Sequence, residues 1–175
     1  GRMWDAVRRH LDPRWRVLTP DLPGHGTRRN ETFTLDAAVA TVVDVVQRAA
    51  PGRVVLGGDS LGGYVSLASA SALPRERLAG LVLSGSSANF NGSALRALLR
   101  RWVLTRLMRA VLGDARIVAM VAKELGKQGI EPRDVQAIVD GDMNPRVFGE
   151  CVQALRDIDF RARAARVEQP VLVLN

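Results

Sequence analysis

The stretch Val54–Gly63, which reads VVLGGDSLGG, decides the fold of this 175-residue chain. An apolar run typical of a buried strand leads into Gly-x-Ser-x-Gly, and a sequence typical of a helix continues from Leu61 to Ala72. In that strand–turn–helix context, the pattern predicts a serine on a very tight turn with its hydroxyl raised above a sheet. The sequence therefore predicts that Ser60 is a nucleophile.

Glycines surround Ser60, and each is expected to serve the tight turn. The turn brings the backbone on its two sides together, so side chains at Gly58 and Gly62 are expected to clash, and Gly63 continues the elbow. The following helix directs its first N–H groups and its positive dipole end toward the serine. We expect the backbone N–H of Leu61 to stabilise a developing oxyanion there.

Asp59 is the rival nucleophile, because it lies on the same turn. If the turn were centred on Asp59, the position two residues later would be Leu61, which is not small. If it is centred on Ser60, both flanking positions are glycines. The frame therefore favours Ser60. A carboxylate beside the nucleophile would either change the local electrostatics or accept a hydrogen bond, and the sequence leaves both open.

Outward from this elbow, short apolar runs alternate with helical periodicity, which is typical of parallel βαβ units. Beside the strand at residues 53–57, strands are expected at 15–19, 80–84 and 171–174, the last a fully apolar run of the buried type. Thr34 is the expected N-cap of a helix that ends before Pro51-Gly52. The remaining helices are expected at 3–11, 93–112, 115–125, 132–140 and 145–157.

A second motif, Pro20-Asp21-Leu22-Pro23-Gly24-His25-Gly26, follows the first predicted strand. Together with the serine elbow, it makes the chain resemble the α/β-hydrolase family closely. The resemblance implies an α/β fold with a mostly parallel sheet flanked by helices and an inserted helical cap. It implies a core with the elbow over residues 1–87, the cap over 88–166 and a returning core strand over 167–175.

The family's catalytic triad runs in the order Ser, then Asp or Glu, then His. No histidine follows Ser60, and the two that precede it, His10 and His25, are expected to be a surface residue and a structural loop residue. By the resemblance, we expect the acid and the histidine beyond Asn175 and the second oxyanion donor before Gly1. The chain is then expected to be an internal piece with little activity of its own.

The resemblance implies a serine hydrolase that cleaves ester, thioester or similar acyl bonds of a small molecule, with no metal or organic cofactor. Three alternatives remain on the same scaffold: an acyltransferase, a cofactor-free haloperoxidase and a non-catalytic ligand-binding protein. The intact elbow argues against the last of these.

Composition narrows the function classes further. Apolar residues make up 47% and charged residues 25%, which excludes disorder, and no apolar run is long enough to span a bilayer.

The single cysteine, Cys151, excludes an internal disulfide and is compatible with a cytoplasmic location. The net charge is +7, and residues 93–127 hold eight basic and two acidic residues. We interpret this stretch as a solvated helical face and expect no nucleic-acid or membrane partner.

Overall fold

The computed structural model describes residues 1–86, 100, 103, 104, 107, 108, 110–142, 144 and 146–174. The helix predicted over 93–112 falls largely outside these residues. The chain divides into two compact units, Gly1–Phe33 with Leu99–Glu150 and Thr34–Leu98 with Cys151–Asn175. The predicted boundaries of core and cap, at residues 87/88 and 166/167, stay a prediction.

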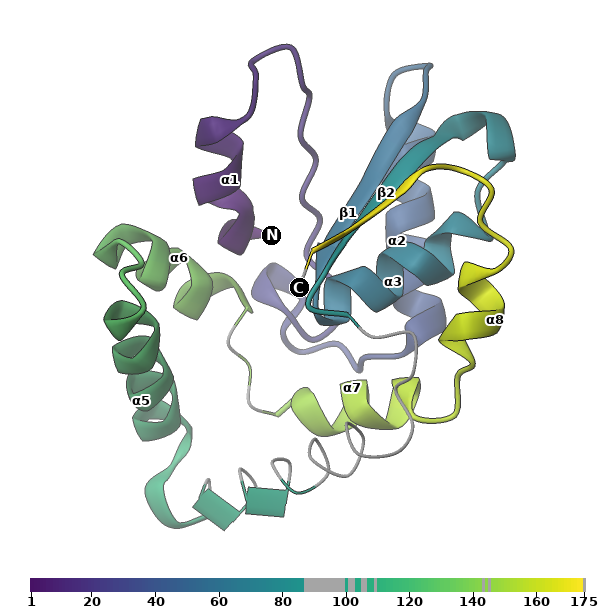
Figure 1. The fold of residues 1–175 in the computed structure, drawn as a ribbon. Helices are drawn as coiled ribbons and strands as arrows, with labels where there is room; N and C mark the ends of the chain where they lie inside the picture. The colour runs from purple at the N-terminus through teal and green to yellow at the C-terminus, as the bar shows by residue number, and fades with distance from the viewer. Residues whose placement is uncertain are drawn as a thin grey trace. The chain divides into compact units, whose positions relative to one another are not determined.

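The second unit contains a three-stranded sheet, in which β1 (Val54–Asp59), β2 (Leu78–Ser84) and β3 (Val171–Leu174) are all parallel (Figure 1). The strand order is β1-β2-β3, so β2 is the central strand. The register places Asp59 beside Ser84 and Ser84 beside Leu174. The predicted α/β class with a parallel sheet is therefore confirmed, and the carboxyl ends of the strands meet at the serine turn.

Helix α3 (Leu61–Ala70) lies against β1 and β2, and α2 (Leu35–Arg48) packs on α3. Every residue of α3 from Gly63 onward is buried, because the helix lies between the sheet and its neighbouring helices. The ring of Tyr64 lies 4.6 Å, centroid to centroid, from that of Phe160 in α8 (Phe160–Ala164), a short helix that the sequence did not reveal. At the start of α2, the Thr34 hydroxyl accepts the Ala37 N–H at 3.1 Å, which confirms the predicted N-cap.

The first unit is helical in its described residues. Helix α6 (Pro132–Asp142) packs against η1 (Arg2–Trp4), η2 (Gly26–Arg28) and α5 (Asp114–Lys127). Ion pairs from Arg9 to Asp134 (2.6 Å) and from Arg2 to Asp140 (3.2 Å) join α6 to the N-terminal segment. No described helix is long and apolar enough to cross a membrane. The remaining elements are α1 (Asp5–His10), η3 (Arg75–Arg77) and α7 (Phe148–Leu155).

The strand predicted over residues 15–19 is wrong as a strand. These residues are not part of the described sheet, which consists of β1, β2 and β3. Trp15 is 59% exposed and Leu18 is 44% exposed. An apolar run indicates a tendency to be buried, but a strand also needs a hydrogen-bonded partner strand, and residues 15–19 pair with none of the described strands.

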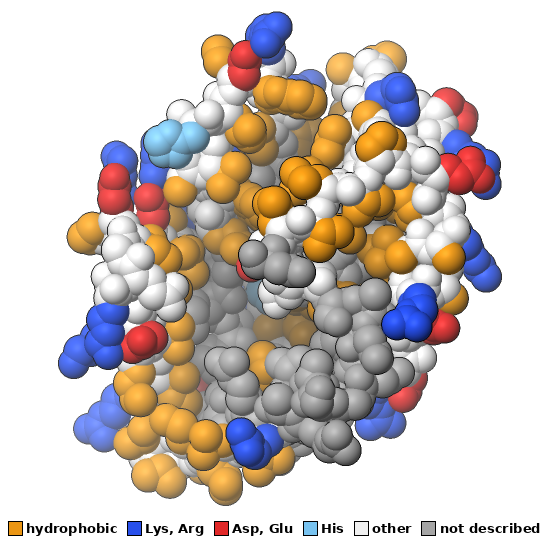
Figure 2. Space-filling view, viewed as in Figure 1, with side chains coloured by type: hydrophobic (Ala, Val, Ile, Leu, Met, Phe, Trp, Pro, Cys, Tyr) orange, Lys and Arg blue, Asp and Glu red, His pale blue; other side chains and the backbone are white. Residues whose placement is uncertain are grey.

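Strand β3 forms where it was predicted, but its predicted burial is wrong. Its side chains are between 43% and 55% exposed. The reason is its covering, because α3 packs on β1 and β2 but not on β3, whose contacts among the described elements are mainly with β2. Hydrophobic side chains gather over the strands on the face shown in Figure 2.

Candidate active site

Ser60 lies on the tight turn between β1 and α3, as the sequence predicted. Its backbone has φ 48° and ψ −112°, and no other described non-glycine residue has a positive φ. Such a conformation costs about 1–3 kcal/mol and persists only where the surroundings enforce it. The side chain is exposed, so its hydroxyl is accessible from solvent. A strained backbone that presents an accessible hydroxyl is a feature typical of an active site.

The predicted close approach of backbone across the turn is confirmed on one side only. A Cβ added at Gly58 would collide with the backbone C and O atoms of Gly62, and would lie 2.5 Å from the N of Gly63. A Cβ added at Gly62 would meet no described atom within 4 Å outside the backbone of its own helix. The predicted clash at Gly62 is therefore not found among the described residues.

Gly63 is constrained by the loop that follows β2. An added Cβ at Gly63 would collide with the hydroxyl of Ser86 and would lie 3.0 Å from the Ser86 Cβ and 3.3 Å from the Gly58 carbonyl oxygen. The absence of a side chain at Gly63 thus leaves room for Ser86 beside the elbow.

Asp59 is held by the neighbouring strand. Its Oδ1 accepts a hydrogen bond of 2.7 Å from the Ser84 hydroxyl, and a Cβ added at Gly85 would lie 3.1 Å from the same oxygen. Of the two roles that the sequence left open, the structure shows the hydrogen bond. Asp59 is half-buried at the end of β1, whereas Ser60 is exposed, so the geometry favours Ser60 over Asp59 as the nucleophile.

The N–H groups at the start of α3 lie beside Ser60. Those of Gly63 and Tyr64 donate to the Ser60 carbonyl oxygen, at 3.1 and 3.3 Å. Leu61 is the first residue of the helix, and the N–H groups of a first turn have no partner within their own helix. The Leu61 N–H directly follows Ser60 at the start of α3, and its role as an oxyanion donor stays a prediction.

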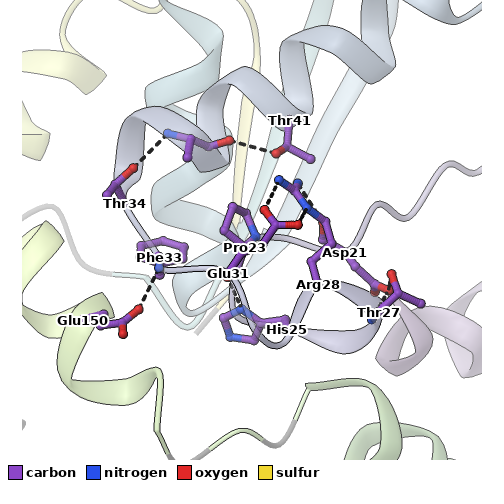
Figure 3. A network of polar contacts seen from close by, with 11 residues as sticks. Asp21, Pro23, His25, Thr27, Arg28, Glu31, Phe33, Thr34, Thr41 and Glu150 are labelled. Carbon is purple, nitrogen blue, oxygen red and sulfur yellow. Dashed lines mark hydrogen bonds and ion pairs between the residues drawn. The ribbon is translucent and has the colours of Figure 1, made fainter.

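The loop that carries the second motif is fixed by Asp21 (Figure 3). Its carboxylate accepts hydrogen bonds from the Gly1 ammonium (2.7 Å) and from the N–H and hydroxyl of Thr27 (both 2.9 Å). Gly26 has φ +52°, and a Cβ there would collide with that carboxylate. The Asp21 carboxylate therefore lies against Gly26 and occupies the space that a side chain there would need.

His25 belongs to the same loop and bonds within it. Its Nδ1 lies 3.0 Å from the Pro23 carbonyl oxygen, and its ring meets Phe33 edge to face at 6.2 Å between centroids (Figure 3). The Phe33 N–H in turn donates to the Glu150 carboxylate at 2.7 Å. These contacts agree with the structural role predicted for His25.

The hydrogen bonds of Asp21 predict a dependence of stability on pH. In the 175-residue chain, which has an ammonium at Gly1, burial raises the pKa of Asp21, but hydrogen bonds from this ammonium and from Thr27 outweigh it and lower the pKa from 3.8 to about 2. A carboxyl group with a lowered folded pKa stabilises the chain above its unfolded pKa, and this contribution is lost as pH falls through the folded pKa. We expect the free energy of unfolding in urea to fall between about pH 4 and pH 2, and Asp21→Asn to remove part of that slope.

The matched variant for this test is Thr27→Val, which keeps the shape of the side chain and removes one of the hydrogen bonds to Asp21. Because the folded pKa of Asp21 then lies closer to its unfolded value, the loss of stability on acidification is expected to be smaller and to end at a higher pH than in the parent chain. Identical pH profiles for the parent chain and Asp21→Asn would contradict this explanation.

Cavities in the described residues occur in the first unit. One of about 220 Å³ is open and polar, and one of about 540 Å³ lies beside α5 and α6. No group of three or more His, Cys, Asp or Glu residues that could hold a metal ion occurs among the residues that the structure describes. The smaller cavity is lined by Arg29, Asn30, Glu31, Thr32, Asn144, Arg146, Val147 and Glu150. The larger is lined by Ala122, Gly126, Gly129, Ile130, Glu131, Pro132 and Val135.

Several known proteins are similar to this chain in sequence. Lipase LipV of Mycobacterium tuberculosis is 35% identical over 97 residues, which span 55% of this chain and 36% of the lipase. A pimeloyl-[acyl-carrier protein] methyl ester esterase of Nitrosomonas europaea is 28% identical over 193 residues, which span 99% of this chain and 70% of the esterase. The chain therefore matches about a third of the first relative's length and more than two thirds of the second's.

Similarity in structure extends over nearly the whole chain. A hydrolase from Pseudomonas aeruginosa PA01 superposes with a TM-score of 0.70 at 26% identity, over 98% of this chain and 65% of that protein. The family model described as the alpha/beta hydrolase family matches residues 1–174. The strained serine turn, the parallel sheet and these matches agree: the chain belongs to the alpha/beta hydrolase family.

Proposed function

We propose that this chain carries the nucleophile of a serine hydrolase that cleaves ester or thioester bonds of small acyl substrates. The observation that carries the proposal is the exposed Ser60 at φ 48°, at the N-terminus of a buried helix. Backbone strain of this kind is concentrated at active sites. The names of the similar proteins, a lipase and a methyl ester esterase, support an ester carbonyl as the target.

The proposed reaction proceeds in two steps. The Ser60 hydroxyl oxygen attacks the carbonyl carbon while its proton passes to a general base, and the Leu61 N–H donates to the resulting oxyanion. The tetrahedral intermediate expels the alcohol or thiol and leaves an acyl group on Ser60. Water then attacks this ester by the same sequence, releases the acid and restores the hydroxyl. The family template uses a histidine as the base, and the sequence after Ser60 contains no histidine.

The test uses short- and medium-chain p-nitrophenyl esters and an acyl thioester. The protein expressed from its complete reading frame is expected to hydrolyse them with saturation kinetics, because acylation at Ser60 follows binding. The 175-residue chain alone, which lacks a histidine after Ser60, is expected to turn over at least about a hundredfold more slowly. Turnover by acyl transfer to an alcohol or by halide oxidation, in place of hydrolysis, would contradict the proposal, as would equal rates for the two proteins.

A further inference from the structure

The segment Ser84-Gly85-Ser86, at the exit of β2, holds the elbow on both sides of Ser60. The Ser60 N–H donates to the Ser84 carbonyl oxygen at 2.8 Å, and the Ser60 carbonyl oxygen accepts a hydrogen bond from the Ser86 hydroxyl at 3.0 Å. The Gly85 N–H donates to the Leu174 carbonyl oxygen at 3.2 Å, which ties the segment to β3. A φ of 48° is unfavourable for serine and persists only where the surroundings enforce it. These hydrogen bonds hold the backbone of Ser60 in that conformation.

Space for the Ser86 side chain is provided by Gly63, where any Cβ would collide with the Ser86 hydroxyl. That hydroxyl lies 3.0 Å from the carbonyl oxygens of both Ser60 and Ser84, so these two acceptors share its single proton. The position of the Ser86 hydroxyl is therefore set by Gly63, which leaves it room, and by the carbonyl groups of Ser60 and Ser84.

The carbonyl of Ser60 and the N–H of Leu61 belong to one planar, trans peptide group. In a trans peptide, the C=O and N–H bonds point in opposite directions. The Gly63 and Tyr64 N–H groups also donate to the Ser60 carbonyl oxygen, at 3.1 and 3.3 Å. The Ser86 hydroxyl adds to these hydrogen bonds, and whatever fixes the direction of the carbonyl also fixes the direction of the Leu61 N–H. This is the backbone donor that the proposed function assigns to the oxyanion.

We propose that Ser86 is a positioning residue, whose hydroxyl orients the Ser60–Leu61 peptide and thereby aims the Leu61 N–H at the oxyanion. This inference rests on the proposed function. An oxyanion donor contributes mainly in the transition state, and its contribution depends on its direction. The loss of such an interaction lowers kcat and leaves KM nearly unchanged.

The experiment compares Ser86→Thr with Ser86→Val in the protein expressed from its complete reading frame. The two side chains have the same shape, and only threonine keeps the hydroxyl, so any effect of the added methyl group is common to both. The valine variant is expected to have a kcat for ester hydrolysis about tenfold below that of the threonine variant, with KM unchanged within about twofold. Ser71→Ala, at the exposed C-terminal end of α3, is the control substitution.

A second readout separates aiming of the donor from general stability. An alkyl boronic acid forms a tetrahedral adduct with a serine nucleophile and places an oxygen in the oxyanion position, so its inhibition constant reports on the Leu61 donor. The valine variant is expected to bind it about tenfold more weakly than the threonine variant. A purely structural role would change the urea midpoint and leave kcat and boronate affinity equal in the two variants, and that result overturns the inference.

Failure of this inference is distinguishable from failure of the proposed function. If Ser60→Ala keeps full activity, the nucleophile assignment fails whatever the Ser86 variants do. If Ser60→Ala is inactive while Ser86→Thr and Ser86→Val have the same kcat, only the positioning role of Ser86 is wrong.

Discussion

Ser60→Ala is expected to reduce kcat for ester hydrolysis by about a million-fold, leaving only the residual catalysis from substrate binding and the oxyanion donors. The substitution removes the oxygen that would form the acyl-enzyme. The Asp59 carboxylate is the nearest rival, but it accepts a hydrogen bond from the Ser84 hydroxyl and lies half-buried at the end of β1. A fluorogenic ester and the protein from its complete reading frame give the sensitivity that this measurement needs.

The control for this prediction is Ser71→Ala, the same chemical change at the other end of α3. It is expected to keep the parent rate, which excludes a general effect of losing a serine from this helix. Activity in Ser60→Ala above about one per cent of the parent rate would contradict the nucleophile assignment. Loss of that remaining activity in a further Asp59→Asn variant would then identify Asp59 as the nucleophile.

Gly58→Ala is expected to lower the free energy of unfolding by about 3 kcal/mol, or to prevent native folding. A Cβ at Gly58 has no room because the backbone of Gly62 and Gly63 lies against it. Backbone atoms cannot move aside as the end of a flexible side chain can, so the elbow itself would have to open. Because the turn at Ser60 depends on this close approach, activity is expected to be lost with stability.

Gly62→Ala is the matched control, since the same methyl group is added four residues along the chain. A Cβ there meets nothing within 4 Å, and alanine is favoured over glycine inside a helix by about 1 kcal/mol or less. Urea unfolding is therefore expected to show Gly62→Ala as stable as the parent or slightly more stable. Equal destabilisation by both substitutions would contradict the one-sided approach and support the symmetric clash that the sequence alone suggests.

Local features of the site were predictable from the sequence. The apolar run before Gly58 and the small residues after Ser60 indicate the strand, the turn and the helix, because each depends on neighbours along the chain. The N-cap at Thr34 was predictable for the same reason, because its hydroxyl bonds to the N–H of Ala37, three residues along the chain. The sequence does not predict that a Cβ would collide with backbone at Gly58 but not at Gly62. That difference depends on how the backbone folds around the turn.

Long-range features were not predictable from the sequence. The bond between Ser86 and the Ser60 carbonyl joins residues 26 positions apart, and nothing in the pattern around Ser86 indicates it. The failed strand at residues 15–19 and the exposed β3 have a common cause, since apolar runs do not specify which strand pairs with which. Asp21 and Gly26 belong to the same motif, five positions apart, and their contact appears only once the loop is folded.

The assignment of Ser60 as the nucleophile is tested most directly by identifying the residue that reacts with a fluorophosphonate probe. Such a probe forms a covalent bond with an activated serine, and peptide mass spectrometry locates the bond. If Ser60 is the nucleophile, the label in the protein from its complete reading frame is expected on Ser60 and is expected to be absent from the Ser60→Ala variant. A label on another residue, or no label on a protein that hydrolyses the test esters, would contradict this assignment.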